Sequence, residues 1–318
     1  MSAIARAAQR LAIEPALVVV TLLLAGLIGV GAMVSDRFAT VGNFLAVLEQ
    51  AAPLGFVAAG QTLVILEGGI DLSVGAIAAA ATVFLAGAVN GRDGLMLPML
   101  AAVLALSALA GLVNGIVTAR TKVHPLVVTL GSGSVLNGLV LLYTLQPTGK
   151  APTWFENFAF GRAFGLPISA LAMVVGFVLV GWMLRKTRLG RNILAVGGNP
   201  EAARLSGIGV DRVTMFVYAA SGFFSGLAGV YFVSRMGVGD PRVGDPLTLA
   251  SITPVIVGGT MLGGGRGGIA GTLVGVLLIS VLNNVLNYTS VSTFIQWVVQ
   301  GLIIIAAVSI FSGGSKRP

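Results

Sequence analysis

Few side chains in this sequence could do chemistry, and the carboxylates of the segment LEGGIDLS, Glu67 and Asp71, stand out because long apolar runs flank them. Acidic groups in such surroundings are costly and usually face a cavity, a partner or the interior of a helical bundle. Asp71 and Ser73 are suited to capping a following helix, whose free N–H groups need acceptors. The three residues could alternatively line a path for a polar solute. We favour the capping role for Asp71.

Amide side chains inside apolar segments form a second group of candidates for a polar path: Asn114, Asn137, Asn283, Asn284 and Asn287. Such a path would suit a hydroxylated solute. Asparagine also joins neighbouring helices by hydrogen bonds within membranes. Both roles remain open for each of these residues.

The residue types argue against catalysis and against metal or cofactor binding. The chain has no cysteine, and His124 is its single histidine, which removes thiolate sites and histidine clusters. The glycine-rich segment Gly258–Gly271 lacks the GxxxxGK[ST] motif of phosphate-binding loops, so we interpret it as a tight turn with close helix packing. We therefore expect no catalytic residue, no metal and no cofactor.

One polar stretch, Arg185–Arg212, interrupts the apolar pattern and contains a very short predicted helix. Asn199 can cap this helix, Pro200 suits its first position, and Gly207 is a natural stop. The six cations of the stretch are Arg185, Lys186, Arg188, Arg191, Arg204 and Arg212, and its two acids are Glu201 and Asp211. The residues of the predicted element are Asn199, Pro200, Glu201, Ala202, Ala203, Arg204, Leu205, Ser206 and Gly207.

A helix of two turns is not stable alone in water, so this element must pack against its own protein or a partner. Ala202 and Ala203 are small enough to allow close approach to a partner, and Leu205 offers apolar contact. Glu201 and Arg204 share a face and can pair with each other or with charges of a partner. Glycine pairs on both sides predict flexible joints. An ordinary connecting loop with one helical turn is the alternative.

The composition places these elements in a membrane. Of 318 residues, 56% are hydrophobic and 9% charged, with 45 glycines, and the mean hydropathy is +0.98. Soluble domains carry roughly 25% charged residues. In lipid every backbone polar group needs an internal partner, which packed helices provide. We predict an all-α polytopic protein in a lipid bilayer. The net charge of +8 does not indicate a nucleic-acid partner, because the cations lie in short loops.

The apolar runs predict about ten transmembrane helices, since roughly 20 apolar residues span a bilayer. The first run is too long for a typical signal-peptide core, so we interpret it as an uncleaved span. The runs cover about 15–34, 45–66, 72–90, 95–118, 125–146, 166–184, 214–234, 247–263, 268–288 and 292–312.

The distribution of positive charge predicts the orientation of these spans. With the N-terminus in the cytoplasm, 13 of the 19 basic residues fall inside and six fall outside. Cytoplasmic loops carry an excess of lysine and arginine. We therefore expect both termini and the Arg185–Arg212 stretch to be cytoplasmic.

Three segments carry a resemblance to a known family: Gln61–Ala79 (QTLVILEGGIDLSVGAIAA), Leu189–Val213 (LGRNILAVGGNPEAARLSGIGVDRV) and Ile256–Asn287. In order and spacing the chain resembles membrane permeases of bacterial ABC sugar importers of the ribose, xylose and arabinose type, within the branched-chain amino acid and sugar permease superfamily. The resemblance covers nearly the whole chain. Glu67 departs from the family, in which a small or hydroxyl residue is usual, so the solute stays open.

The resemblance implies one transmembrane permease domain over residues 1–318 in the bacterial inner membrane, with a cytoplasmic coupling loop at about 185–213. A periplasmic binding protein would deliver a sugar or related polyol, and a second permease copy would complete the path. A cytoplasmic ABC ATPase would hydrolyse ATP, so the chain itself is not an enzyme. The helix Asn199–Gly207 would contact the ATPase. Alternatives are import of a nucleoside, autoinducer or amino acid, or a stand-alone secondary transporter.

Overall fold

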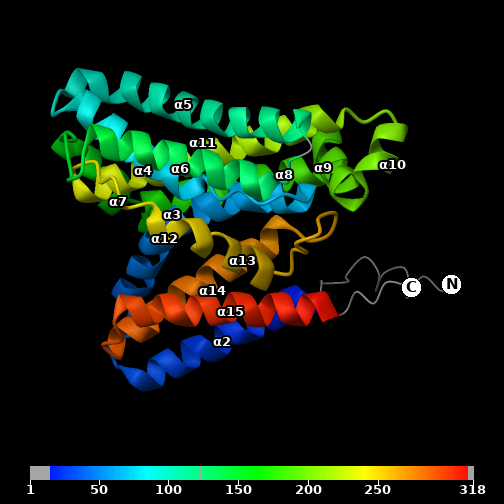
Figure 1. Cartoon of the computed structure of the whole chain (residues 1–318). Helices are drawn as coiled ribbons and strands as arrows, with labels where there is room; N and C mark the ends of the chain where they lie inside the picture. The colour runs from blue at the N-terminus through cyan, green and yellow to red at the C-terminus, as the bar shows by residue number, and fades with distance from the viewer. Residues whose placement is uncertain (1–14, 122, 314–318) are drawn as a thin grey trace.

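The computed structural model describes residues 15–121 and 123–313, and this part of the chain is mostly helical (Figure 1). The all-α polytopic prediction is confirmed, because seven of the described helices are long and apolar enough to cross a membrane. They are α2 (Pro15–Val34), α3 (Val41–Glu67), α5 (Asp93–Arg120), α6 (Pro125–Tyr143), α8 (Ile168–Lys186), α11 (Val210–Met236) and α14 (Ile269–Tyr288). The basic residues Arg6, Arg10, Lys122, Lys316 and Arg317 lie outside the described residues.

Three further segments are apolar, of which one is short and one is broken into two helices. Two of them are α4 (Val74–Val89) and α15 (Thr293–Gly313), and the third is the pair α12 (Asp245–Ala250) and α13 (Ile252–Val257). The prediction of one continuous helix over 247–263 is therefore wrong. Pro254 has no N–H to donate to the carbonyl of Ala250, and its ring crowds that carbonyl, so the helix breaks at Ser251.

The centre of the molecule is formed by α3 and α11, which pack against each other, while α4 and α5 pack on α11. The contact between α5 and α11 is close because glycines face each other there. A Cβ atom on Gly111 would collide with the backbone of Tyr218 and lie 3.0 Å from the nitrogen of Gly222. Small residues allow such approach of helices within membranes.

A second group of helices flanks this centre. Figure 1 shows α2, α14 and α15 as a layer beside the main bundle. Helix α14 packs on α2, α3 and α13, while α15 packs on α13. The space between this layer and the central helices holds the pocket described below.

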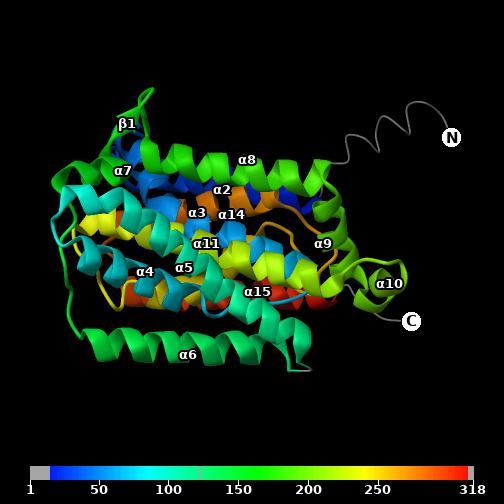
Figure 2. The same ribbon diagram turned by 90° about the horizontal axis from the view of Figure 1, so that it is seen from above.

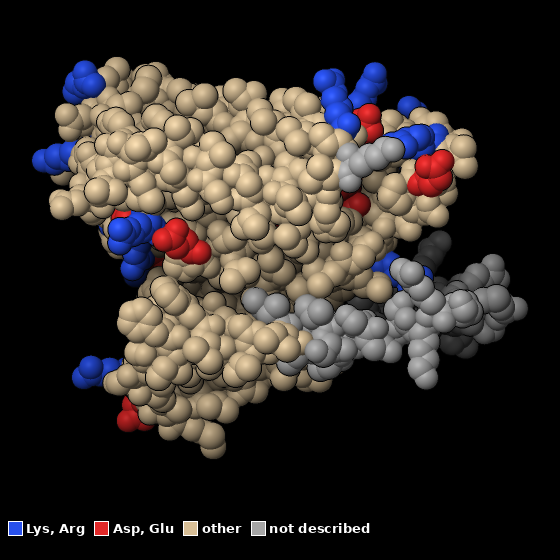
Figure 3. All heavy atoms as spheres, in the orientation of Figure 1, with Lys and Arg blue, Asp and Glu red and all other residues tan. Residues whose placement is uncertain are grey.

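The two ends of the bundle carry different short elements (Figure 2). One end holds the turn η1 (Thr153–Glu156), the helix α7 (Asn157–Phe160) and a two-stranded antiparallel sheet of β1 (Arg162–Ala163) and β2 (Leu166–Pro167). The opposite end holds α9 (Arg188–Gly198) and α10 (Pro200–Leu205). On the face shown in Figure 3, charged side chains gather toward these ends and an uncharged band separates them. This band has the character of a lipid-facing surface.

Candidate functional site

The helix predicted from the motif GNPEAARLSG is present as α10, and its predicted cap, first residue and stop are confirmed. The Asn199 side chain caps it by accepting a 3.0 Å hydrogen bond from the N–H of Ala202. Pro200 occupies the first helical position, where no intrahelical N–H bond is lost. Gly207 ends the helix with a φ of +81°, a left-handed conformation that favours glycine.

A second helix, α9, precedes α10 and was not predicted. Thr187 caps α9 by accepting a 3.1 Å hydrogen bond from the N–H of Gly190. Ile193 and Val196 are buried on one face, and α9 packs on α3, α8 and α11. The polar stretch is thus two helices rather than a loop with one helical turn, and α9 attaches α10 to the membrane-spanning bundle.

The two alanines of α10 point in different directions. Ala203 is only 4% exposed and belongs to the hydrophobic core, so the prediction that it faces a partner is wrong. Ala202 is exposed, and Leu205 is 82% exposed. Arg204 lies 4.0 Å from Glu201 and 3.6 Å from Asp211, and all three side chains are largely exposed. One surface of α10 therefore remains free, with Leu205 as its apolar part.

Glycines from the end of α3, from α9 and from the loop before α14 meet at one place. We name these residues, Gly68, Gly197, Gly264 and Gly265, the glycine junction. The N–H of Gly265 donates a 2.9 Å hydrogen bond to the carbonyl of Leu66 at the end of α3. A Cβ atom on Gly197 would overlap that same carbonyl, and one on Gly264 would lie 2.9 Å from the Cα of Gly68. Gly197 is therefore locked in packing, and the flexible joint predicted there is absent.

The glycine junction confirms the interpretation of the segment Gly258–Gly271 as a tight turn with close helix packing. Gly264 and Gly265 have φ values of +78° and +72°. At the start of α14, Gly271 packs directly against the backbone of Gly258. Through this turn α9 contacts both the end of α3 and the loop before α14.

Asp71 is fully buried between α3 and α4, and both of its carboxylate oxygens accept hydrogen bonds. One oxygen accepts from the N–H and the hydroxyl of Ser73, at 2.9 and 2.6 Å. The other accepts from the hydroxyl of Ser221 on α11 at 2.8 Å. Asp71 thus satisfies the N–H of the residue before α4. Ser73 directs its hydroxyl at Asp71 and makes no side-chain cap of α4, so its predicted capping role is wrong.

Two more helices and a second contact from α3 hold this turn in place. The Asn114 amide on α5 donates to the Ser73 hydroxyl at 2.8 Å, and the Thr129 hydroxyl on α6 accepts from the N–H of Leu72 at 3.0 Å. The Gln61 amide on α3, oriented from its hydrogen-bonding partners, meets the carbonyl and N–H of Asp71 at 3.2 and 3.3 Å. Asp71, Ser73 and Asn114 therefore form one network that joins α3, α4, α5, α6 and α11.

Two of the predicted path residues belong neither to that network nor to the pocket described below. Glu67 is half-buried at the end of α3 and accepts a 2.6 Å hydrogen bond from the Thr214 hydroxyl on α11. Asn137 is half-buried on α6. Neither residue is among those that line the pocket between the two groups of helices.

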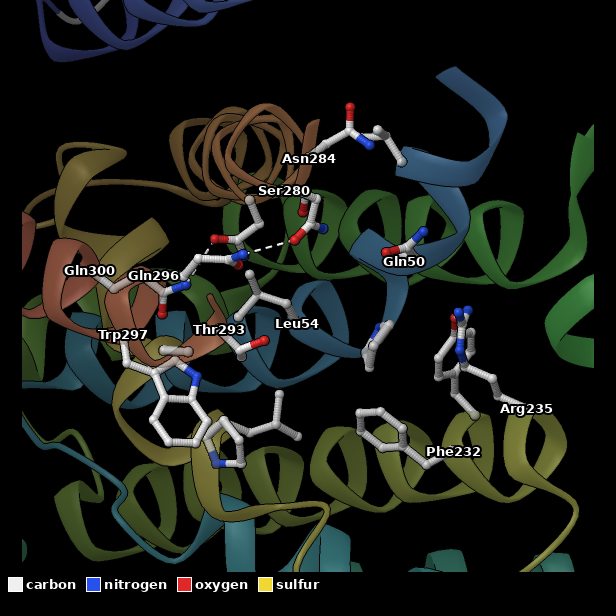
Figure 4. A pocket seen from close by; sticks show the side chains of 18 residues that line it. Gln50, Leu54, Phe232, Arg235, Ser280, Asn284, Thr293, Gln296, Trp297 and Gln300 are labelled. Atoms are coloured by element: carbon white, nitrogen blue, oxygen red, sulfur yellow. Dashed lines mark hydrogen bonds between the residues drawn. The ribbon is translucent and has the colours of Figure 1, made fainter. Parts of the chain in front are cut away.

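The pocket has a volume of about 310 Å³ and lies between α3, α11, α12, α14 and α15 (Figure 4). The predicted path residues Asn283 and Asn284 line it, as does Asn287. Sequence reasoning missed three further amides there, Gln50, Gln296 and Gln300, together with the indole of Trp297. The four-residue spacings of 283 with 287 and of 296 with 300 were an available signal, because such residues share one face of a helix.

Hydrogen bonds between the pocket amides fix their orientation. Asn284 exchanges two 3.0 Å hydrogen bonds with Asn43 of α3, joining α14 to that helix. Gln300 donates to the Asn283 oxygen at 3.1 Å, and Gln296 donates to the Asn287 oxygen at 2.7 Å. These bonds tie α15 to α14. The Gln296 amide nitrogen also donates to the carbonyl of Val291 at 3.2 Å, so both of its N–H groups are engaged and its oxygen is the group left for a ligand.

One charged side chain lines the described wall of the pocket, and it is paired. Arg235 of α11 lies 2.8 Å from the carboxylate of Glu49 on α3 and donates a 3.0 Å hydrogen bond to the Tyr231 hydroxyl. Its guanidinium also lies 5.6 Å from the centre of the Phe160 ring. Since Glu49 offsets its charge, Arg235 adds little net charge to the pocket.

Comparison with known proteins decides the family. Residues 43–308 match the family described as the permease component of branched-chain amino acid transport systems. The chain belongs to this family. It is 42% identical over 272 residues to the ribose import permease protein of Bacillus subtilis (strain 168), covering 84% of this chain and 83% of that protein. No solved structure gives a significant match.

Two further relatives extend the comparison within this permease family. The ribose import permease protein of Escherichia coli (strain K12) is 38% identical over 287 residues, which cover 89% of each chain. The fructose import permease protein of Rhizobium meliloti is 36% identical over 309 residues, covering 93% of this chain and 85% of that protein. The resemblance to permeases of sugar importers is thereby confirmed, and the chain is a transport subunit rather than an enzyme.

Proposed function

We propose that this permease is the membrane subunit of an ATP-driven importer, forming one domain over residues 1–318 in the bacterial inner membrane. The observation that carries the proposal is α10, a capped, six-residue helix with an exposed apolar side chain. It is held at the end of the bundle by α9, one face of which is buried. A helix so short is not stable alone and presents a free surface. A cytoplasmic ABC ATPase is the partner that this surface would contact.

The solute of the proposed importer is a sugar or related polyol. The relatives named above are import permeases for ribose and fructose. A periplasmic binding protein delivers the solute to the end that carries β1 and β2, and a second permease copy completes the complex. The energy comes from the separate ATPase.

We further propose ten spans with both termini in the cytoplasm. The seven long helices and the three further apolar segments add up to ten. The start of α2 and the end of α15 lie at the same end of the bundle as α10 (Figure 1). The excess of basic residues in the loops at that end supports its cytoplasmic position.

The proposed topology can be tested with single introduced cysteines, because the native chain has none. Phe164 between β1 and β2 is fully exposed, and Leu205 of α10 is largely exposed. We expect a membrane-impermeant maleimide to label Phe164→Cys in intact spheroplasts and Leu205→Cys only after permeabilisation. Labelling of Leu205→Cys in intact spheroplasts would contradict the cytoplasmic position of α10.

The coupling role of α10 predicts that a charge at Leu205 weakens binding of the ATPase. Leu205→Asp should reduce co-purification of the ATPase at least about tenfold, since loss of a central interface contact costs ~1–2 kcal/mol or more. Leu205→Met retains an apolar side chain and should bind normally. Both variants should insert into the membrane at wild-type levels because Leu205 is exposed. Equal ATPase recovery with both variants would remove the main support for this proposal.

A further inference from the structure

The pocket between α14, α15 and the central helices is built for a particular class of solute. Six of its lining residues carry amide side chains: Gln50, Asn283, Asn284, Asn287, Gln296 and Gln300. Ser280 and Thr293 add hydroxyl groups. Figure 4 shows Gln50 and Gln300 on opposite sides of the cavity. Together these amides offer both donors and acceptors, which is what a row of hydroxyl groups requires.

The charges of the pocket decide between solute classes. Among the described residues that line it, Arg235 alone is charged, and Glu49 pairs with it at 2.8 Å. An amino acid carries an ammonium and a carboxylate, and burying either without a countercharge is costly. A neutral solute has no such requirement. The pocket therefore disfavours a free amino acid, although the family is described by amino acid transport.

The size and the aromatic groups narrow the class further. The volume of about 310 Å³ lies at the lower end of the ~300–1,000 Å³ typical of small-molecule pockets. Trp297 and Phe232 lie on the two sides of the cavity (Figure 4). The negative face of an aromatic ring attracts the C–H groups of a sugar ring. Trp297 is 48% exposed, so its ring is available to a ligand.

We infer that this pocket is a binding site for a single neutral, polyhydroxylated molecule of monosaccharide size, held by the pocket amides and by Trp297. The inference rests on the proposed function and deepens it by placing solute recognition in the permease itself. Gln50 and Trp297 contribute directly to binding. The pair of Glu49 and Arg235 keeps the pocket electrically neutral.

The test is direct binding of radiolabelled D-ribose, D-fructose, L-arabinose and D-allose to the full-length permease in lipid nanodiscs, with L-leucine as the amino acid probe. We expect at least one sugar to bind and L-leucine not to compete with it. Gln50→Leu and Trp297→Ala should each weaken that binding at least tenfold. Trp182→Ala is the matched control, because Trp182 is exposed on α8 away from this pocket.

Uptake by the complete transporter separates failure of this inference from failure of the proposed function. Absence of sugar binding, competition by L-leucine, or unchanged affinity in both pocket variants would overturn the inference. An unchanged KM for sugar import in both variants would also overturn the inference. ATP-dependent uptake by the wild type would still leave the proposed function standing. If the wild-type complex imports none of the sugars with ATP, the proposed function fails instead.

Discussion

Replacement of Asp71 by leucine should prevent assembly of a functional permease. Asp71 is fully buried and accepts from the N–H and hydroxyl of Ser73 and from the hydroxyl of Ser221. Leucine leaves these donors without an acceptor in a dry region, at a cost of ~1–3 kcal/mol for each buried group. We expect little monodisperse protein on size-exclusion chromatography. Any monodisperse protein that remains should have a melting temperature more than about 5 °C below that of the wild type.

Asp71→Asn is the control for this variant. The remaining amide oxygen still accepts from Ser73, and the Ser221 hydroxyl can rotate to accept from the new amide nitrogen. We therefore expect a melting temperature near that of the wild type and substantial uptake. If the leucine variant is as stable and active as the asparagine variant, the Asp71 network does not hold the turn between α3 and α4.

A methyl group at Gly197 should have the second large effect. It would overlap the carbonyl of Leu66 and lie 2.5 Å from the nitrogen of Gly265. Both are backbone atoms, so the end of α9 would have to move away from α3 and from the loop before α14. Overpacking of this kind typically costs ~1–3 kcal/mol. We expect Gly197→Ala to lower uptake at matched protein levels by about tenfold or more.

The adjacent glycine provides a control within the same helix. Apart from its chain neighbours and its own helix backbone, no atom lies within 4 Å of a Cβ atom built on Gly198, and both glycines belong to α9. Gly198→Ala should therefore transport normally, and its greater helix propensity could stabilise α9 slightly. Equal loss of uptake in both variants would show that helix flexibility, rather than the packing of the glycine junction, matters at this position.

Local features of the fold could be predicted from the sequence because they depend on nearby residues. The cap Asn199 and the stop Gly207 of α10 follow rules that operate within one turn. The apolar runs likewise indicated the membrane-spanning helices. The break at Ser251 does not follow from length and composition, because the run 247–263 suits one span by both; it depends on Pro254 within the run.

The arrangement of the site residues in space depends on contacts between distant segments, so it could not be predicted from local sequence patterns. Ala203 and Ala202 are neighbours of the same type, yet only the position of α9 determines that Ala203 is buried. Asn283 and Asn284 were recognised as path candidates, while Gln50 was missed because its place in the pocket depends on how α3 packs near α14. Asn114 was also a candidate, and its membership of the Asp71 network depends on how α5 packs near α4.

The central claim, that an ATPase drives this permease through α10, is tested most directly by measuring sugar uptake and ATP hydrolysis in the same vesicles. Vesicles would hold the permease and its ATPase, with sugar-loaded binding protein added outside. We predict that uptake requires ATP and that Leu205→Asp abolishes both uptake and the stimulation of hydrolysis by the binding protein, while Leu205→Met retains both. Uptake that continues without ATP, or a Leu205→Asp variant with normal uptake and stimulated hydrolysis, would contradict the account.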